Sequence, residues 1–342
     1  MHVTVKQVSH AFLAVLIAAM LAFTSFSAKA QENNSGGSGL RVSPTRTELS
    51  LLPGDSDQIT QTVRNVTQSP VSVQPSLNDF EADGVTGQPQ LIGDPNEISE
   101  HSLREFISLP DEFELQPDEE KELTVNLSVP QNAAPGAYFG SVLYRASPIG
   151  ASNDGQVALV ASVGSLVLLE VPGDITEQIS IESVSAYVDD KAGSLFTQKP
   201  NNIGILVNNL GNGFAKPFGK IQVTDMRGSS IFEYELNDDQ RRKNVLPESS
   251  RLFTQEFANV EERTVNGVAE QDKTNPIKWP GKYTISGNIS HGTTGELFTV
   301  SSTFWYIPSW LVIAAVVLLI VLIAVAFFSY RKYKSKSLRR KK

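Results

Sequence analysis

Between residues 40 and 304 the sequence shows no sustained helical period. Instead, short runs in which apolar and polar residues alternate recur between clusters of Gly, Pro, Asn and Asp, as at residues 59–63, 123–129 and 221–224. In a strand, such alternation directs apolar side chains to one face and polar side chains to the other. The pattern therefore predicts an all-β body made of sandwiches.

An internal repeat indicates that there are two such sandwiches. A strand-ending Asn occurs at Asn65 and again at Asn209, and a Pro-Gly-x-Tyr motif occurs at residues 135–138 and again at 280–283. The first offset is 144 residues and the second is 145. Repeated motifs at a nearly constant offset favour tandem immunoglobulin-like domains. We expect the first sandwich at residues 40–173 and the second at 174–304.

The repeated motifs have a structural explanation. Proline fixes φ and glycine allows positive φ, so a Pro-Gly pair predicts a tight turn before a strand. The Tyr that follows can bury its ring, and an Asn at a strand end can hydrogen-bond its own backbone. The predicted turn residues are Pro53, Gly54, Asn65, Pro135, Gly136, Tyr138, Asn209, Pro280, Gly281 and Tyr283.

Local pattern predicts the structure of three further segments. The nearly continuous apolar run at residues 157–171 predicts two central strands with a turn near Gly164. The polar stretch 261–278 is predicted to be an insertion loop of the second copy, and residues 78–101 a long acidic loop.

The N-terminus has the features of a secretory signal. Lys6 supplies a weakly basic start, residues 11–23 are apolar, and Ala28-Lys29-Ala30 matches a cleavage site. Residues 1–30 are therefore predicted to be a signal peptide, and residues 31–39, rich in Asn, Ser and Gly, a flexible leader. An uncleaved N-terminal anchor is the alternative.

Near the C-terminus, residues 311–328 are uninterruptedly apolar. As a helix this run would be about 27 Å long, close to the thickness of the hydrocarbon layer. Aromatic residues suited to the membrane interface flank it, so we expect a transmembrane helix with its flanks at residues 305–330. A buried core helix is the alternative. The predicted membrane-interface residues are Trp305, Tyr306, Trp310 and Tyr330.

Charge is segregated along the chain. The formal net charge is −8, but two of the 29 basic residues lie in residues 1–30 and eight lie in residues 331–342, which leaves 19 in the body against all 37 acidic residues. An acidic body argues against nucleic-acid binding. The basic tail at 331–342 predicts a single-pass protein with a cytoplasmic tail and an extracellular body. Binding of this tail to anionic lipid is a second reading of its charge.

The chemistry-bearing residues are sparse. The chain has no cysteine, which excludes disulfides, thiolate metal sites and a cysteine nucleophile. His101 and His291, the histidines beyond the signal peptide, are expected to be solvated. Residues 79–84 imitate the start of a calcium loop, yet Gln90 stands where a bidentate Glu is needed, which favours an acidic hairpin loop. We therefore predict neither a metal, a cofactor nor an enzymatic activity.

Several short motifs together resemble the WxL-interacting cell-surface proteins of monoderm bacteria. They occur in order over nearly the whole mature chain: residues 42–44, 51–54, 129–130, 134–140, 171–174, 209–212, 244–247 and 303–305. The resemblance implies a peptidoglycan-binding first domain, a second domain that binds a protein partner, and a membrane anchor. The acidic loop 78–101 and the insertion 261–278 are the two segments that depart from the resemblance.

Three functions remain open from the sequence. The first is a non-catalytic, membrane-anchored scaffold that binds peptidoglycan and a surface protein. The second is an adhesin or partner-binding protein without affinity for the wall, and the third is a cell-wall hydrolase, because abundant Asp and Glu leave a catalytic carboxylate pair open. For a binding protein, Phe139 and Tyr144 beside the Pro-Gly turn are the expected partner contacts.

Overall fold

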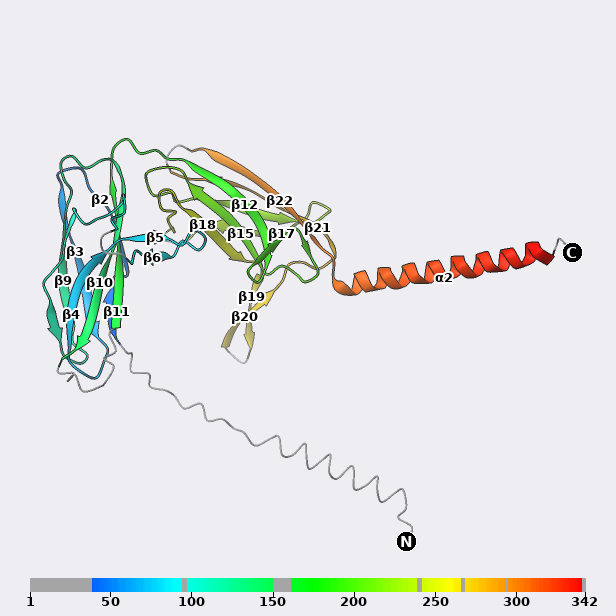
Figure 1. Cartoon of the computed structure of the whole chain (residues 1–342), viewed down its shortest axis with the longest axis horizontal. Helices are drawn as coiled ribbons and strands as arrows, with labels where there is room; N and C mark the ends of the chain where they lie inside the picture. The colour runs from blue at the N-terminus through cyan, green and yellow to red at the C-terminus, as the bar shows by residue number, and fades with distance from the viewer. Residues whose placement is uncertain are drawn as a thin grey trace, which may run out of the picture. The chain divides into compact units, whose positions relative to one another are not determined.

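The computed structural model describes residues 39–93, 97–149, 161–238, 242–265, 268–292 and 295–339. The predicted signal peptide and residues 31–38 of the predicted leader lie outside the described residues. The described chain consists mostly of strands and contains one long helix, α2 (Ser309–Arg339) (Figure 1). The fold class is confirmed: two immunoglobulin-like sandwiches are followed by a C-terminal apolar helix.

The first sandwich consists of a four-stranded sheet in the order β1-β3-β9-β7 and a five-stranded sheet in the order β2-β11-β10-β4-β8. A hairpin, β5–β6, extends from it. The bounds are β1 (Leu40–Ser43), β2 (Arg46–Ser50), β3 (Ser56–Asn65), β4 (Val71–Asn78), β5 (Phe80–Ala82), β6 (Pro89–Leu91), β7 (Ile107–Ser108), β8 (Phe113–Leu115), β9 (Glu120–Ser128), β10 (Gly136–Pro148) and β11 (Ala161–Val171).

The second sandwich repeats this plan, with sheets in the orders β13-β12-β15-β18 and β14-β22-β21-β16-β17. Its separate hairpin is β19–β20. The bounds are β12 (Ile179–Val188), β13 (Lys191–Gly193), β14 (Leu195–Phe196), β15 (Asn202–Asn209), β16 (Phe218–Thr224), β17 (Ser230–Leu236), β18 (Ser250–Glu256), β19 (Asn259–Val265), β20 (Val268–Thr274), β21 (Gly281–Ser290) and β22 (Leu297–Tyr306).

Alternation explains how each sheet buries one face. In β9, Leu123, Val125 and Leu127 are buried and the residues between them are exposed. Each sandwich has its own hydrophobic core between its two sheets. Because burial of apolar side chains is the main favourable term in folding, these two cores are what hold the sheets in pairs.

The prediction of a turn near Gly164 is wrong. Strand β11 continues through this residue, and Gly164 is paired with Leu143 of β10. A Cβ at Gly164 would lie 2.8 Å from Leu143 Cδ2 and 2.9 Å from Ser141 Oγ. The glycine is therefore needed because neighbouring side chains cross it closely, not because the chain turns there. Residues 157–160 of the predicted strand pair lie outside the described residues.

The predicted insertion loop is largely a hairpin. Strands β19 and β20 pair from Asn259↔Thr274 to Val265↔Val268 and include most of residues 261–278. The sequence did not indicate them because both strands are strongly polar and lack an apolar face. Likewise, part of the predicted acidic loop forms the hairpin β5–β6, paired from Phe80↔Leu91 to Ala82↔Pro89.

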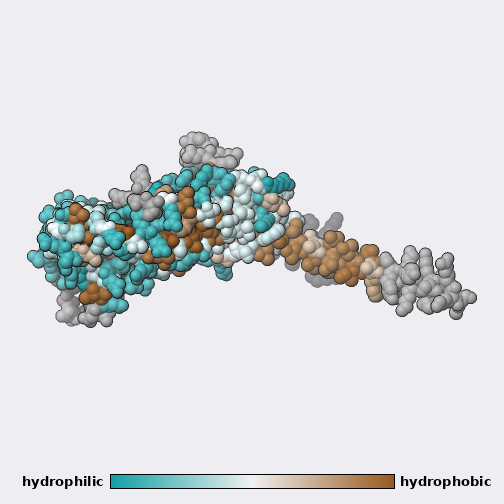
Figure 2. Space-filling model, turned by 90° about the horizontal axis from the view of Figure 1, so that it is seen from above, coloured by the Kyte–Doolittle hydropathy of each residue, from teal (hydrophilic) through white to brown (hydrophobic). Residues whose placement is uncertain are grey.

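The C-terminal helix begins directly after the second sandwich. Strand β22 ends at Tyr306, so Trp305 and Tyr306 lie in the sheet, whereas Trp310 and Tyr330 lie in α2. The segment Ser309–Phe327 is long and apolar enough to cross a membrane. Figure 2 shows its continuous hydrophobic surface. The helix continues to Arg339, through most of the predicted basic tail.

Candidate functional site

A groove opens on the second sandwich where the edge strands of its two sheets face each other. Strand β17 is the edge of one sheet and strand β18 the edge of the other. The groove has a volume of about 710 Å³. Its lining residues are Val85, Thr86, Tyr187, Asp189, Asp190, Asn202, Tyr234, Glu235, Leu236, Asn237, Asp238, Lys243, Arg251, Leu252, Phe253, Thr254 and Gln255.

Strand β17 contributes an aromatic residue, Tyr234, to the lining of this groove. Its alternation turns Phe232 and Leu236 into the core, and Tyr234, on the same face, packs against that core and lines the groove. The Tyr234 hydroxyl is buried and has no hydrogen-bond partner among the described residues. Burial also raises the pKa of Tyr234, so the side chain stays neutral and can donate a hydrogen bond to a ligand.

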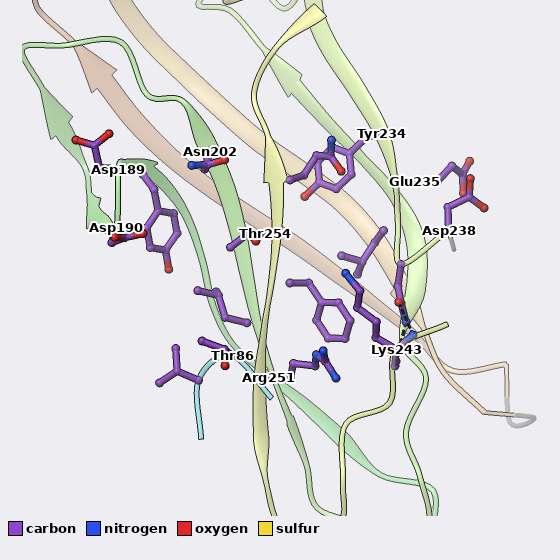
Figure 3. A pocket seen from close by; sticks show the side chains of 17 residues that line it. Thr86, Asp189, Asp190, Asn202, Tyr234, Glu235, Asp238, Lys243, Arg251 and Thr254 are labelled. Carbon is purple, nitrogen blue, oxygen red and sulfur yellow. Dashed lines mark hydrogen bonds between the residues drawn. The ribbon is translucent and has the colours of Figure 1, made fainter. Parts of the chain in front are cut away.

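Charged side chains line the groove. Figure 3 shows Asp189 and Asp190 on one side of the groove and Glu235 and Asp238 on the other, with Arg251 and Lys243 together at one end. Four carboxylates against two cations make the groove acidic. Such a lining favours a ligand with positive charge.

The guanidinium of Arg251 lines the groove and also makes a structural hydrogen bond. It donates a hydrogen bond of 2.9 Å to the carbonyl of Asn244, and burial lowers its pKa. A Cβ at Gly87 would lie 2.8 Å from Arg251 Cδ, so only glycine allows the hairpin to pass this side chain closely.

The hairpin β5–β6 closes the same end of the groove. The carbonyl of Val85 at its tip accepts a 2.6 Å hydrogen bond from the amide of Leu252, on the edge of β18. The tip is held by Asp83, whose carboxylate accepts hydrogen bonds from the amides of Val85 and Gly87 at 3.1 and 2.7 Å. The hydroxyl of Thr86 donates to the same carboxylate, which lowers the pKa of Asp83. The acidic loop thus contributes Val85 and Thr86 to the groove.

The predicted partner contact Tyr144 is buried in the first core. Its exposed fraction is 0%, and its hydroxyl donates a 2.6 Å hydrogen bond to Gln61 Oε1. The amide of Gln61 donates to Ser165 Oγ at 3.0 Å, and Ser165 Oγ donates to the carbonyl of Pro44 at 2.7 Å. Burial raises the pKa of Tyr144 to about 12. The side chain has an internal role, and its burial argues against a partner contact.

Phe139 is also inaccessible, with an exposed fraction of 4%. It packs with Phe80 and Leu168, and the partly buried Phe214 and Leu246 of the second sandwich contact the same cluster. The ring centroids of Phe139 and Phe214 are 6.2 Å apart. The residue therefore joins the two sandwiches inside the chain, which again does not fit the expected surface contact.

Backbone and ionic contacts support that junction. The amide of Ala137 donates a 2.8 Å hydrogen bond to the carbonyl of Asn212, and Asn212 Nδ2 donates to the carbonyl of Pro135 at 3.3 Å. Lys216 Nζ lies 2.6 Å from a carboxylate oxygen of Glu48. The two Pro-Gly turn residues of the first sandwich, Pro135 and Gly136, therefore lie against the second sandwich.

The two strand-ending asparagines have equivalent surroundings. Asn65 Nδ2 donates to the carbonyls of Ser69, Leu115 and Gln116, and its Oδ1 accepts from the amide and hydroxyl of Thr67. Both asparagines are almost completely buried.

In the second sandwich, Asn209 Nδ2 donates to the carbonyls of Gly213 and Val245, and its Oδ1 accepts from the amide of Gly211. These bonds join the turn that follows each strand to a second backbone segment, at Leu115 and Gln116 in the first sandwich and at Val245 in the second.

The other predicted turn residues are likewise structural in their contacts. Tyr138 donates from its hydroxyl to the carbonyl of Ala134 at 3.0 Å, and Tyr283 does the same to the carbonyl of Trp279 at 2.5 Å. Gly54, which follows Pro53, has a φ of +88°. Gly281 is the first residue of β21 and Gly136 is the first residue of β10, so in both sandwiches the Pro lies directly before the strand.

The histidines are less solvated than expected. His291 is buried, with an exposed fraction of 2%, so the prediction of a solvated side chain is wrong for this residue. His101 is partly buried and lies with Nδ1 2.8 Å from the carbonyl of Ala137. The sequence placed both in polar segments but gave no sign that those segments fold back on the sheets.

Two of the three carboxylates of the calcium-like segment, those of Asp79 and Asp83, are used internally. Asp79 is buried, accepts a hydrogen bond of 2.7 Å from Ser102 Oγ, and lies 3.2 Å from Arg104 Nε. Asp83 holds the hairpin tip as described above. Within the described residues, no three His, Asp or Glu side chains form a group that could hold a metal ion.

Comparisons with known proteins add only to the description of the fold. No protein-family model and no curated protein matches the sequence. Solved structures similar to this chain include the class 5 fimbriae chaperone CfaA, with 13% identity and a TM-score of 0.36 over 79% of this chain and 100% of that chain.

The E. coli chaperone DraB is similar at 14% identity and a TM-score of 0.33, over 77% of this chain and 95% of that one. The Pseudomonas aeruginosa CupB2 chaperone is similar at 12% identity and a TM-score of 0.34, over 77% of this chain and 100% of that one. These likenesses concern the sandwich fold alone. The structure thus defines a tandem immunoglobulin-like protein with a candidate membrane helix.

Proposed function

We propose that this chain is a non-enzymatic, membrane-anchored surface protein of the WxL-interacting type, whose second sandwich binds a protein partner. The observation that carries the proposal is the acidic groove at the edges of β17 and β18, lined by Tyr234, whose buried hydroxyl has no hydrogen-bond partner among the described residues. The membrane helix would hold this groove outside the cell, with the basic tail in the cytoplasm.

The partner segment that fits the groove best is extended and basic. An edge strand has backbone N–H and C=O groups free on one side, and an added strand can pair with them. Lysine or arginine side chains of that segment would face Asp189 and Asp190 on one wall and Glu235 and Asp238 on the other. The Tyr234 hydroxyl would donate to a carbonyl of the bound segment.

A photoreactive benzoylphenylalanine in place of Thr254 tests this assignment on cells that make the full chain. Thr254 is exposed and lines the groove; Thr299, equally exposed on β22 of the other sheet, is the matched control site. We expect a discrete crosslinked species from position 254 that is absent at position 299 and is weakened by Glu235→Gln with Asp238→Asn. Equal crosslinking at both sites, or none at position 254, would overturn the groove as the partner site.

Wall binding by residues 40–173 is a separate part of the proposal and is supported by the resemblance described above. We test it by sedimenting the full chain in detergent micelles with isolated peptidoglycan over a salt series. Saturable pelleting that survives moderate salt supports a wall-binding scaffold, because screened charge attraction fades with salt. Absence of pelleting favours the alternative, a partner-binding protein or adhesin without wall affinity.

A further inference from the structure

The end of the second sandwich from which the helix leaves carries exposed apolar side chains. Trp279 is 76% exposed, Met226 67%, Leu195 65% and Trp305 44%. Large apolar residues that gather at one place on a folded domain mark a contact surface. We call these four residues the apolar end.

Strand pairing places all four residues together. Gly281 is paired with Tyr306, the last residue of β22, and Trp279 comes two residues before Gly281. A Cβ at Gly281 would lie 3.1 Å from Met226 Sδ, so the Met226 turn lies against this strand start. Leu195 of β14 is paired with Trp305.

The chain itself holds the apolar end close to the membrane. Between the end of β22 at Tyr306 and the start of α2 at Ser309 stand only two residues, which span about 7 Å at most. The polar headgroup layer on each side of a bilayer is itself about 5–7 Å thick. When the segment Ser309–Phe327 crosses a bilayer, the apolar end must therefore lie at headgroup level.

Basic side chains surround the apolar end. Arg227 follows Met226, and Lys278 and Lys282 flank the Trp279 turn; all three are exposed and make no ion pair with a described residue. The nearby carboxylate of Asp225 accepts hydrogen bonds from the amides of Arg227 and Ser229, at 2.8 and 2.9 Å. Three cations beside exposed aromatic and thioether side chains match the phosphate and acyl boundary of a lipid surface.

The other sheet of the second sandwich, β13-β12-β15-β18, has acidic residues in one of its turns. Its β12–β13 turn carries Asp189 and Asp190, which belong to the acidic groove. Lipid phosphates would repel these two carboxylates. The contact with lipid is therefore assigned to the side of the sandwich that bears Met226 and Trp279.

We propose that the second sandwich docks on the outer surface of the membrane through Met226 and Trp279, with Arg227, Lys278 and Lys282 contacting anionic phospholipid headgroups. This inference rests on the proposed membrane anchor. Docking at this end would fix the height of the domain above the bilayer and limit its rotation about the two-residue connection. The groove would then face a partner in a restricted set of orientations.

Tryptophan fluorescence provides a direct test, because the chain has three tryptophans, Trp279, Trp305 and Trp310. The full chain with Trp305→Phe and Trp310→Phe keeps Trp279 alone. It is reconstituted into phosphatidylcholine vesicles, with and without phosphatidylglycerol, that contain lipids brominated on the acyl chain near the headgroup. We expect blue-shifted Trp279 emission that the brominated lipids quench.

The matched control is Leu297→Trp in a chain whose three native tryptophans are Phe. Leu297 is 66% exposed and begins β22, about 30 Å from the strand's other end. We expect water-like, unquenched emission from this position. Quenching of position 297 to the same extent as Trp279 would overturn a specific docking face.

A chain that keeps Trp310 alone separates docking from anchoring. Quenched Trp310 with unquenched Trp279 would overturn the docking face and leave the anchor in place. If Trp310 also stays unquenched, the membrane anchor of the proposed function is wrong.

A further variant tests whether the basic side chains contribute to docking. With Lys278→Gln and Lys282→Gln, we expect Trp279 quenching in phosphatidylglycerol vesicles to fall to the level in phosphatidylcholine alone. Quenching that is unchanged by these substitutions and by phosphatidylglycerol would overturn the assignment to anionic headgroups.

Discussion

In the first sandwich, Gln61 of β3 is hydrogen-bonded to Tyr144 of β10 and Ser165 of β11, so buried polar groups connect its two sheets. The equivalent positions of the second sandwich, found by counting from the strand-ending Asn and the Pro-Gly motif and, for Ser165, from the strand pairing, are apolar and buried. They are Ile205, Ile289 and Val300.

This difference shows which features of the repeat the fold depends on. Both sandwiches keep the buried Asn at the end of a central strand and the Tyr after the Pro-Gly turn. The middle of the core tolerates either hydrogen bonds or apolar packing, provided that every buried polar group has a partner. The first core is therefore the more sensitive to loss of a single polar atom.

The largest effect is expected at the two asparagines. Asn65→Ala removes partners from three backbone carbonyls and should cost about 3 kcal/mol, whereas Asn209→Ala, with two such carbonyls, should cost about 2 kcal/mol. Native-state hydrogen exchange of the β3 and β15 amides measures the free energy of unfolding of each sandwich separately.

Asn65→Asp is the control, since it keeps the acceptor for Thr67 but loses the donors to the carbonyls. It should be nearly as unstable as Asn65→Ala. Equal, small effects at both asparagines would show that these turns do not depend on the side-chain bonds.

The next effect is expected at Tyr144. Tyr144→Phe leaves Gln61 Oε1 buried without a donor and should destabilise the first sandwich by about 1–3 kcal/mol. Adding Gln61→Leu removes that unpaired oxygen and should recover part of the loss. At the equivalent position of the second sandwich, Ile289→Val should cost about 1 kcal/mol by lost packing alone. Hydrogen exchange of the same amides checks all three, and a double variant less stable than Tyr144→Phe would contradict the account.

The tyrosines after the Pro-Gly turns should matter less. Tyr138→Phe and Tyr283→Phe each remove one hydrogen bond to a carbonyl four residues earlier and should cost about 1 kcal/mol each. Thermal unfolding of the two variants measures this. A much larger effect of Tyr283→Phe would indicate that its bond to the Trp279 carbonyl holds more of the structure than the turn.

The smallest difference is expected in the pH dependence of unfolding. Burial raises the pKa of Tyr144 to about 12, above the ordinary value of about 10, so the unfolded chain loses this proton first. The stability contribution is therefore complete below pH 10 and is lost as the pH rises from about 10 to about 12. Unfolding midpoints of the wild type should fall more steeply in this range than those of Tyr144→Phe; parallel curves would exclude the effect.

Much of the fold could be predicted because it depends on local pattern. Alternation indicated strands such as β9, and the repeated Asn and Pro-Gly-x-Tyr motifs indicated two copies of one fold. The pattern failed in β10 and β11, where Gly, Ser and Tyr interrupt long buried strands. The pattern therefore predicts a turn at Gly164, where β11 continues, and a surface position for Tyr144, which is buried.

The candidate site could not be predicted because it joins residues far apart in the sequence. Tyr234 looks like any alternating strand residue until β18 is seen to face it, and nothing local shows that Val85 reaches Leu252. The packing of Phe139 against Phe214 across the two sandwiches is hidden for the same reason. The sequence therefore predicts where the strands lie along the chain, whereas the contacts between distant strands are seen only in the structure.

The most direct test of the proposed anchored surface protein is its membrane topology, and the absence of cysteine makes that test clean. Single variants Ser301→Cys, in β22, and Ser337→Cys, in the C-terminal segment of α2, are labelled on intact cells with a membrane-impermeant maleimide. We expect labelling of position 301 on intact cells and of position 337 only after permeabilisation. Labelling of position 337 on intact cells, with position 301 protected, would contradict this topology.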